Sequence, residues 1–349
     1  MAATKHKSHL TIGIIGSGIA GLSAAWLLSL QGHEVHLYEK CDSLGLGAHT
    51  VQVGPCGDVV DVPIRFFVDE FYTELLSLFR YVGIDTVIAS LSPSIQVYGQ
   101  SCHYKLHNVI FGRRAIPFVY PWELLKNLSS YWAILRDLIY FRKASLHVQK
   151  NKDIRSSLSR VTLAEYLLDN NYSKEFTDGF LIPIFAIVST SSAQDSRNYP
   201  VTVVMDFLIT MFMTSKTTRR MTAGTRAASK TLAKNIKVKH TNVKVQKVIP
   251  IRNAGGELQG LQVHASGLPV ETFDHVIIAT QANQALKLFQ DKQHDVREKA
   301  LKGFRYVWSE VVIHSDEPNG YHYFERPVVT IETEQALQQL QEIQGCDNI

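Results

Sequence analysis

The feature that most constrains this chain is an apolar strand that runs directly into a glycine-rich turn. Residues 10–15 are apolar and rich in β-branched side chains, as in a buried parallel strand. The next six residues have the spacing G-x-G-x-x-G, in the order Gly16-Ser17-Gly18-Ile19-Ala20-Gly21. This spacing is typical of the first βα turn of a dinucleotide-binding unit. We expect Gly16 to form the tight turn, Gly18 to admit a pyrophosphate, and Gly21 to let the following helix pack closely.

A carboxylate follows at the place where such a unit needs one. The helix is expected to stop at Gly32, and residues 34–39 predict a second strand that ends on Glu39, 18 positions beyond Gly21. An acid there accepts hydrogen bonds from both ribose hydroxyls of an adenosine and repels a 2′-phosphate, which disfavours NADP. FAD and NAD both remain open on this motif. The alternative is a glycine-rich turn with a surface acid and no ligand.

The same N-terminal segment has a second interpretation, as a membrane anchor. Residues 10–30 carry no charge and follow Lys5 and Lys7. Four glycines interrupt the segment, however, and a polar stretch resumes at once, so a strand, turn and helix explain it better. No other segment is long and apolar enough to span a bilayer. We expect no transmembrane span and a cytoplasmic location.

Composition bounds the remaining possibilities. The chain has 349 residues, of which 45% are hydrophobic and 19% charged, so we expect two domains with packed cores. Its cysteines share no C-x-x-C spacing and its 14 histidines no H-E-x-x-H spacing, so the sequence predicts a reducing compartment and no metal site. The four cysteines are Cys41, Cys56, Cys102 and Cys346.

Positive charge is concentrated in one stretch. Residues 207–256 contain eleven lysines and arginines and no acid, although the whole chain has a net charge of only +4. Arg226, Lys230 and Lys234 are spaced to share one helix face. A solvated face is the ordinary explanation, and peripheral contact with an anionic membrane is an alternative. Without interleaved aromatic residues, the stretch does not favour nucleic acid.

Four further segments resemble the flavin-containing amine oxidoreductases. The resemblance depends on the order of these segments along the chain, because none of them alone would identify the family. They are residues 44–51, 61–65, 181–189 and 273–280, the last followed by an expected helix over 281–288. The chain departs from the family pattern at Leu46, Gly47 and Pro63. These departures support an alternative in which the protein binds a nucleotide without catalysis.

The resemblance implies a Rossmann-type α/β domain that binds FAD, with a β-hairpin inserted in its parallel sheet, plus a mostly helical substrate domain. The FAD-binding domain would comprise residues 1–83 and 217–349, and the substrate domain residues 84–216. The resemblance implies hydride transfer to the flavin from an amine or an apolar, allylic small molecule, and an NAD-dependent oxidoreductase is the alternative. No catalytic side chain is identified. The cofactor contacts it implies are Gly16, Ser17, Gly18, Ala20, Gly21, Glu39, Lys40, Gly45 and Val245.

Hydrophobic periodicity predicts the elements of the two domains. Apolar residues spaced three and four apart predict an amphipathic helix over 122–144, and further helices are expected over 162–170 and 203–214. Their aromatic residues line a substrate pocket or form the core of this domain. Strands over 237–251 and 258–263 flank a turn at 253–256, which predicts a hairpin. The resemblance implies that the Val245 backbone lies against the adenine, and the alternative is that Val245 belongs to the hairpin core.

In the resembled family a strand and a glycine-rich turn beside the flavin ring follow a segment like 336–348. The printed sequence ends at Ile349, where that element is expected to begin. We therefore expect this chain alone to retain flavin weakly and to show low or absent turnover.

Overall fold

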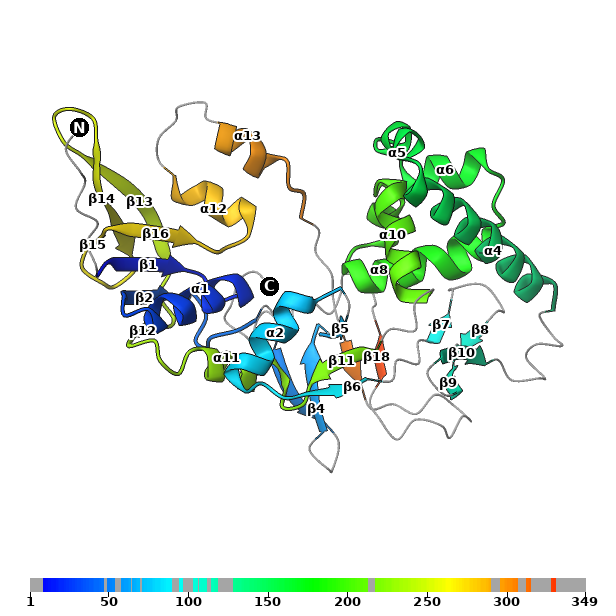
Figure 1. Cartoon of the computed structure of the whole chain (residues 1–349), viewed down its shortest axis with the longest axis horizontal. Coiled ribbons are helices and arrows are strands. Elements are labelled where there is room, and N and C mark those ends of the chain that lie inside the picture. The colour runs from blue at the N-terminus through cyan, green and yellow to red at the C-terminus, as the bar shows by residue number, and fades with distance from the viewer. Residues whose placement is uncertain are drawn as a thin grey trace.

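The computed structural model shows two lobes, one built around β-sheets and one of helices (Figure 1). It describes residues 9–46, 49–53, 58–63, 65–69, 71–89, 94–96, 103–105, 107–111, 114–118, 128–212, 217–289, 296–306, 312–314 and 328–330. The expected features at Gly47, at residues 122–127 and at residues 336–349 lie outside these ranges. In the described part of the chain no helix is long and apolar enough to cross a membrane.

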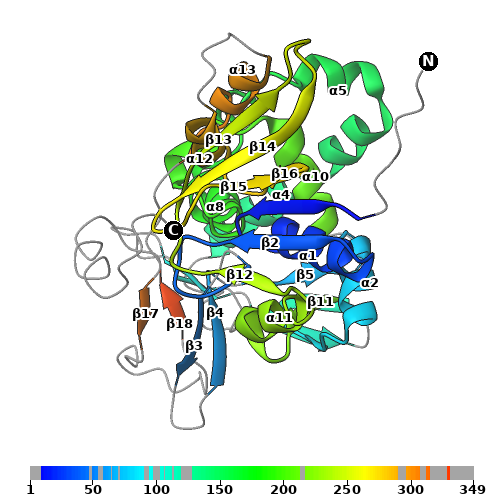
Figure 2. The same ribbon diagram turned by 90° about the vertical axis from the view of Figure 1, so that its left-hand side faces the viewer.

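A four-stranded parallel sheet forms the centre of the first lobe, in the order β12-β2-β1-β16 (Figure 2). Its members are β1 (Thr11–Ile15), β2 (Glu34–Tyr38), β12 (Val238–His240) and β16 (His275–Ile278). Helix α1 (Ile19–Leu30) connects β1 to β2. Ile15 pairs with both Tyr38 and Ile278, so these three strands end at the same edge. The predicted Rossmann-type unit is confirmed.

The two central strands that are farthest apart in sequence are tied together by a carboxylate. Asp274 accepts hydrogen bonds from the Thr11 backbone N–H at 2.9 Å and from its hydroxyl at 3.1 Å. The Asp274 N–H donates in return to the Thr11 carbonyl at 3.0 Å. These bonds fix the register in which β1 and β16 begin.

A second, antiparallel sheet packs against the central one and contains the predicted hairpin. It comprises β13 (Val245–Arg252), β14 (Leu258–Ala265) and β15 (Glu271–Phe273). The hairpin turn is confirmed, with Gly256 at a φ of 82° and its N–H donating to Asn253. The single strand predicted over 237–251 is wrong. Asn242, at a φ of 57°, divides it into β12 and β13, because the chain turns there to leave the parallel sheet.

Further elements complete the lobe on its other side. Helices α2 (Thr73–Val82) and α11 (Gly224–Leu232) contribute to the core that α1 shares with the central sheet. Strands β5 (Phe67–Val68), β11 (Thr218–Met221) and β6 (Thr86–Ile88) form one small sheet. Strands β3 (His49–Val53) and β4 (Asp58–Val62) form a hairpin. Because β6 and β11 are paired, the chain leaves this lobe and returns to it at neighbouring strands.

The second lobe is helical over residues 128–212. Its elements are α4 (Leu128–Lys150), α5 (Lys152–Leu158), α6 (Leu163–Asp169), α7 (Lys174–Phe176), the π-helix η1 (Thr177–Leu181), α8 (Ile182–Ser189), α9 (Ala193–Arg197) and α10 (Val201–Phe212). The helix predicted over 162–170 is confirmed as α6, and Thr162 and Glu165 form a reciprocal capping box at its start. Helix α10 begins two residues before the predicted one. The proposed domain boundaries stay a prediction.

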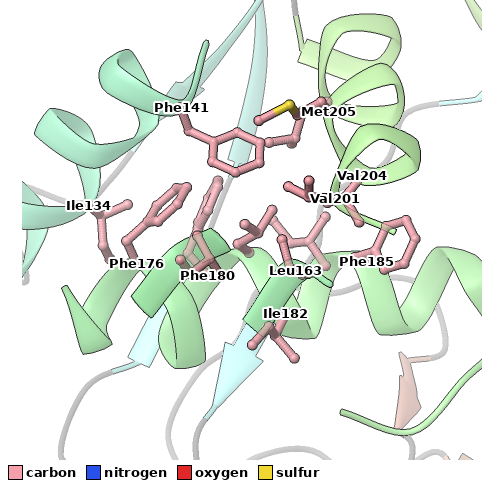
Figure 3. Packing of buried hydrophobic residues seen from close by; sticks show 14 of the residues in the cluster. Ile134, Phe141, Leu163, Phe176, Phe180, Ile182, Phe185, Val201, Val204 and Met205 are labelled. Atoms are coloured by element: carbon pink, nitrogen blue, oxygen red, sulfur yellow. The ribbon is translucent and has the colours of Figure 1, made fainter. Parts of the chain in front are cut away.

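Aromatic and aliphatic side chains from α4, α6, α7, α8 and α10 fill the core of this lobe (Figure 3). Helix α4 does not bury the stripe that periodicity suggested: Trp132 is 68% exposed and Leu135 49% exposed. It buries the face that carries Ile134, Asp137 and Phe141. The pattern was misleading because this face contains a carboxylate, whose burial is compensated by hydrogen bonds.

The remaining described elements are short. Strands β7 (Ser94–Gln96) and β8 (His103–Lys105), β9 (His107–Phe111) and β10 (Arg114–Phe118), and β17 (Val312–His314) and β18 (Val328–Thr330) form three antiparallel pairs. Helices α12 (Ala282–Leu288) and α13 (Val296–Lys302) follow β16. Helix α12 confirms the one expected over 281–288.

Candidate dinucleotide-binding site

The turn between β1 and α1 has the geometry that its glycines predicted. Gly16 has a φ of +100°, and a Cβ there would lie 2.7 Å from the Ala279 carbonyl oxygen. A Cβ on Gly21 would lie 1.9 Å from the Gly16 carbonyl oxygen. A side chain at Gly16 or Gly21 would therefore collide with backbone. The turn and the close helix packing both require glycine at these positions.

Gly18 differs from the other two glycines because no described residue lies within 4 Å of the position its Cβ would take. It is the N-cap residue of α1, no side chain in the described part of the chain caps this helix, and the first turn contains no acid. Ala20, in that first turn, is exposed. The first N–H groups of a helix have no intrahelical partner and lie at the positive end of its dipole. Gly18 and the start of α1 thus form an open cradle for an anionic group.

Ser17 connects the glycine turn to the acid at the end of β2. Its N–H and its hydroxyl both donate to Glu39 Oε2, at 2.9 Å and 2.5 Å. Glu39 Oε1 accepts from the Cys41 N–H at 3.0 Å. The Gly45 N–H donates to the Ser17 hydroxyl at 3.1 Å. The structure therefore brings together three of the expected contacts, Ser17, Glu39 and Gly45, at the carboxyl ends of the strands beside the cradle.

The two other expected contacts lie near this group. Lys40 directly follows Glu39 and is half-buried. The side chain of Val245 is 7% exposed and packs with Ile15 and Tyr38 in the core below the hairpin. Val245 begins β13, and the N–H of Val243, two residues earlier, donates to the Glu39 carbonyl at 2.9 Å. The side chain thus has the core role, and an adenine contact would fall to the backbone.

A second polar network, which the sequence did not predict, lies between β3, β4 and α11. Asp61 accepts from the Thr225 N–H and hydroxyl, both at 2.9 Å, and from the Thr50 hydroxyl at 2.7 Å. The carboxylate therefore satisfies the N-terminus of α11. A cavity of about 420 Å³ lies beside it; it is lined by Thr50, Gln52, Ala223, Arg226, Ala227 and Lys230. The spacing of Arg226 and Lys230 had placed them on one face, but nothing in the local sequence linked them to Asp61.

Fold and site together define a class, the dinucleotide-binding proteins of the Rossmann type. Residues 14–82 match the model of the NAD(P)-binding Rossmann-like domain family. A stretch of 73 residues is 42% identical to 1-hydroxycarotenoid 3,4-desaturase of Flavobacterium sp. (strain P99-3), covering 21% of this chain and 14% of the desaturase.

More particularly, the fold is shared with two amine oxidases. Putrescine oxidase bound to putrescine is 17% identical, with a TM-score of 0.58 over 84% of this chain and 63% of the oxidase. Cyclohexylamine oxidase from Brevibacterium oxydans IH-35A is 20% identical, with a TM-score of 0.54 over 84% of this chain and 63% of that oxidase. The resemblance stated from the sequence is confirmed at the level of the fold. The chain spans less than two thirds of the length of these oxidases.

Proposed function

We propose that this protein is a FAD-dependent oxidoreductase of the amine oxidase type. The observation that carries the proposal is the open cradle at Gly18 beside the Glu39 carboxylate, in a chain with the amine oxidase fold. A bulkier residue at position 18 would fill this space, whereas glycine leaves room for a pyrophosphate next to the helix N-terminus. The donor set and the free space both suit the adenosine diphosphate half of FAD.

In this proposal the chain's own residues bind and orient the cofactor. The N–H groups at the start of α1 receive the pyrophosphate, and Glu39 exchanges the Ser17 hydroxyl for a ribose hydroxyl. The bond between Ser17 and Gly45 holds the loop after β2 against the turn. A bound flavin supplies the chemistry, as acceptor of a hydride from the substrate.

The substrate we propose is a small amine or an apolar, allylic molecule. The fold shared with two amine oxidases supports the first, and the local similarity to a carotenoid desaturase supports the second. The aromatic residues of the helical lobe that are buried, such as Phe141 and Phe176, pack with one another. These buried aromatic residues therefore belong to the core of the lobe, and the substrate site lies elsewhere in this proposal.

Cofactor titration tests the proposal. The purified 349-residue chain is titrated with FAD and, separately, with NADH, while flavin fluorescence and nicotinamide fluorescence are recorded. We expect saturable binding of FAD that is tighter than that of NADH and that is lost in Gly18→Val. Preferential binding of NADH would replace the proposal with an NAD-dependent oxidoreductase. Binding of neither cofactor, by a chain with native circular dichroism, would refute both.

A turnover assay separates an enzyme from a protein that only binds nucleotide. The FAD-saturated chain is mixed anaerobically with putrescine, cyclohexylamine or a carotenoid, and the loss of flavin absorbance is followed. Because low turnover is expected of this chain alone, the expected result is slow bleaching by one of these substrate classes. Tight FAD binding without bleaching by any of them would favour the non-catalytic alternative.

A further inference from the structure

Three potential metal ligands meet on the face of the central sheet that the hairpin covers. His36 lies on β2, His240 on β12 and Glu271 on β15. One ligand atom from each lies within 4.8 Å of the others, and all three residues are half-buried. The alternation of side chains along β2 explains the placement, because His36 and Tyr38 point to this face while Val35 and Leu37 point toward α1.

The contacts within the group leave one imidazole nitrogen unused. His36 Nδ1 lies 3.0 Å from Glu271 Oε2, and the Tyr38 hydroxyl donates to the same oxygen. His240 stacks on the Tyr38 ring with centroids 4.8 Å apart and planes at 21°. Its Nε2 is inaccessible to solvent and has no hydrogen-bond partner in the described part of the chain. A buried polar atom without a partner costs free energy, so its retention calls for a role.

A plain hydrogen-bond network explains only part of this arrangement. It accounts for Glu271, which holds His36 and Tyr38, but it leaves His240 Nε2 without a function. A metal ion accounts for all three ligands at once, since it would take a lone pair from each imidazole and from the carboxylate. Two imidazoles and one carboxylate form a donor set that suits Zn²⁺, and not the all-oxygen preference of Ca²⁺ or Mg²⁺.

We propose that His36, His240 and Glu271 bind a divalent transition metal of the zinc class, with water in the remaining position. Tetrahedral Zn²⁺ places its ligand atoms about 3.3 Å apart, so small side-chain rotations would suffice from the present spacing. The Tyr38 hydroxyl would remain bonded to the carboxylate and orient it. The proposal does not depend on which cofactor the glycine turn binds.

The place of the site in the fold gives it a structural role. The ligands join two strands of the central sheet to the sheet above it, and β2 continues directly into Glu39, whose N–H donates to the His240 carbonyl at 2.8 Å. A metal bound to the folded state and not to the unfolded chain stabilises the fold by mass action. A bound metal ion should therefore hold β15 of the hairpin sheet against β2, the strand that leads into Glu39.

Cobalt is the probe that tests the ligand set. The 349-residue chain is freed of metal with a chelator, dialysed and titrated with Co²⁺, followed by competition with Zn²⁺. We expect one high-affinity ion per chain, visible d–d bands typical of nitrogen and oxygen ligands, and a rise in the thermal midpoint. His240→Gln and Glu271→Gln should each weaken zinc binding on the order of 100-fold. The Glu271→Gln variant keeps the side-chain shape, so it covers the case in which His240→Gln does not fold.

His275→Gln is the matched control, because His275 is an exposed histidine on β16, the opposite edge strand of the same sheet from β12, and lies outside the cluster. It should bind zinc as the unaltered chain does. Equal zinc affinity in the unaltered chain and in folded His240→Gln or Glu271→Gln would overturn the proposal. So would an intense near-ultraviolet sulfur-to-cobalt charge-transfer band, which would assign the ion to cysteine.

Discussion

The Ser17 hydroxyl donates to Glu39 Oε2 over 2.5 Å, and through this bond the glycine turn and the acid that follows β2 form one unit. The same hydroxyl accepts from the Gly45 N–H. Ser17 is 1% exposed, so these bonds are shielded from water. The order of the loop after β2 therefore depends on one buried serine.

Ser17→Ala should lower both stability and cofactor affinity. The change removes the hydroxyl and leaves the Gly45 N–H without its partner, which should cost ~1–3 kcal/mol in the free energy of unfolding. Urea denaturation measures this loss. Ser77→Ala is the control, because Ser77 is an exposed residue whose hydroxyl donates to the Thr73 carbonyl one turn earlier, and we expect a change within about 0.5 kcal/mol. Equal effects of the two substitutions would contradict the role given to Ser17.

Glu39→Ala should weaken FAD binding by ~1.5–3 kcal/mol, since charge-assisted hydrogen bonds to the ribose are lost. This corresponds to a dissociation constant about 10- to 150-fold higher. Fluorescence titration provides the measurement, with Glu74→Ala in the exposed first turn of α2 as the control. An unchanged dissociation constant would show that Glu39 serves only Ser17 and Cys41.

Two glycine substitutions in the same motif should affect different properties, one the affinity for FAD and the other folding. Gly18→Val adds atoms to open space, so the chain should fold while FAD affinity falls by about tenfold or more, equivalent to ~1.4 kcal/mol. Gly21→Val would place a Cβ 1.9 Å from the Gly16 carbonyl oxygen, so folding itself should fail. Circular dichroism and flavin titration distinguish the two outcomes. A Gly18→Val chain that binds FAD with undiminished affinity would exclude the cradle as the pyrophosphate site.

Asp61→Ala should destabilise the junction between β4 and α11. It deprives the Thr225 N–H, the Thr225 hydroxyl and the Thr50 hydroxyl of their common acceptor. We expect a loss of about 2 kcal/mol, the upper part of the range for a helix N-cap. Asp153→Ala, at an exposed acid in the first turn of α5, should cost far less in the same denaturation assay. A loss no larger than that of the control would mean that this network is dispensable.

The buried carboxylate of α4 should make stability depend on acid pH. Burial raises the pKa of Asp137, but hydrogen bonds from Arg136 and Ser173 outweigh this and hold its pKa below the ordinary value. The unfolded chain, with a pKa of about 3.9, takes up a proton first on acidification. The stabilisation is therefore complete above that value and is lost as the pH falls through the lower folded pKa.

Asp137→Asn provides the measurement for this pH dependence. The difference in unfolding free energy between the unaltered chain and the variant should be constant between about pH 6 and 8 and shrink below about pH 4. Ser173→Ala, which removes a donor to the same carboxylate, should also reduce the acid-dependent loss. A difference that stays constant down to pH 3 would contradict the assigned cause.

The parts of the fold that the sequence predicted correctly are those with short-range causes. The turn at Gly16 and the helix predicted over 162–170 depend on residues within a few positions, so the printed pattern suffices. The acid at Glu39 was placed correctly beside the turn, because a βα unit has a narrow range of lengths.

The features that were missed depend on contacts across long stretches of chain. Asp61 accepts from Thr225, 164 residues later, as well as from Thr50. The partners of Glu271 are His36 and Tyr38, more than 230 residues earlier, so the local sequence predicts neither group. The buried face of α4 was missed for a related reason. A hydrophobic pattern treats Asp137 as a polar residue and so assigns it to the exposed face of the helix. Its burial depends on a hydrogen bond from Ser173, 36 residues later.

The hydrogen bonds between Thr11 and Asp274 also affect the order in which the two lobes fold during synthesis. The two residues are 263 positions apart, so β1 has no partner on its β16 side until nearly all of the described chain has been made. At ~5–20 residues per second this delay is about 10–50 s. Among the described residues, the buried core of the helical lobe runs from Ile134 to Leu208 and needs no such wait. Contacts between distant residues form slowly, so the helical lobe should be compact while the first strand of the nucleotide-binding sheet is still exposed to chaperones.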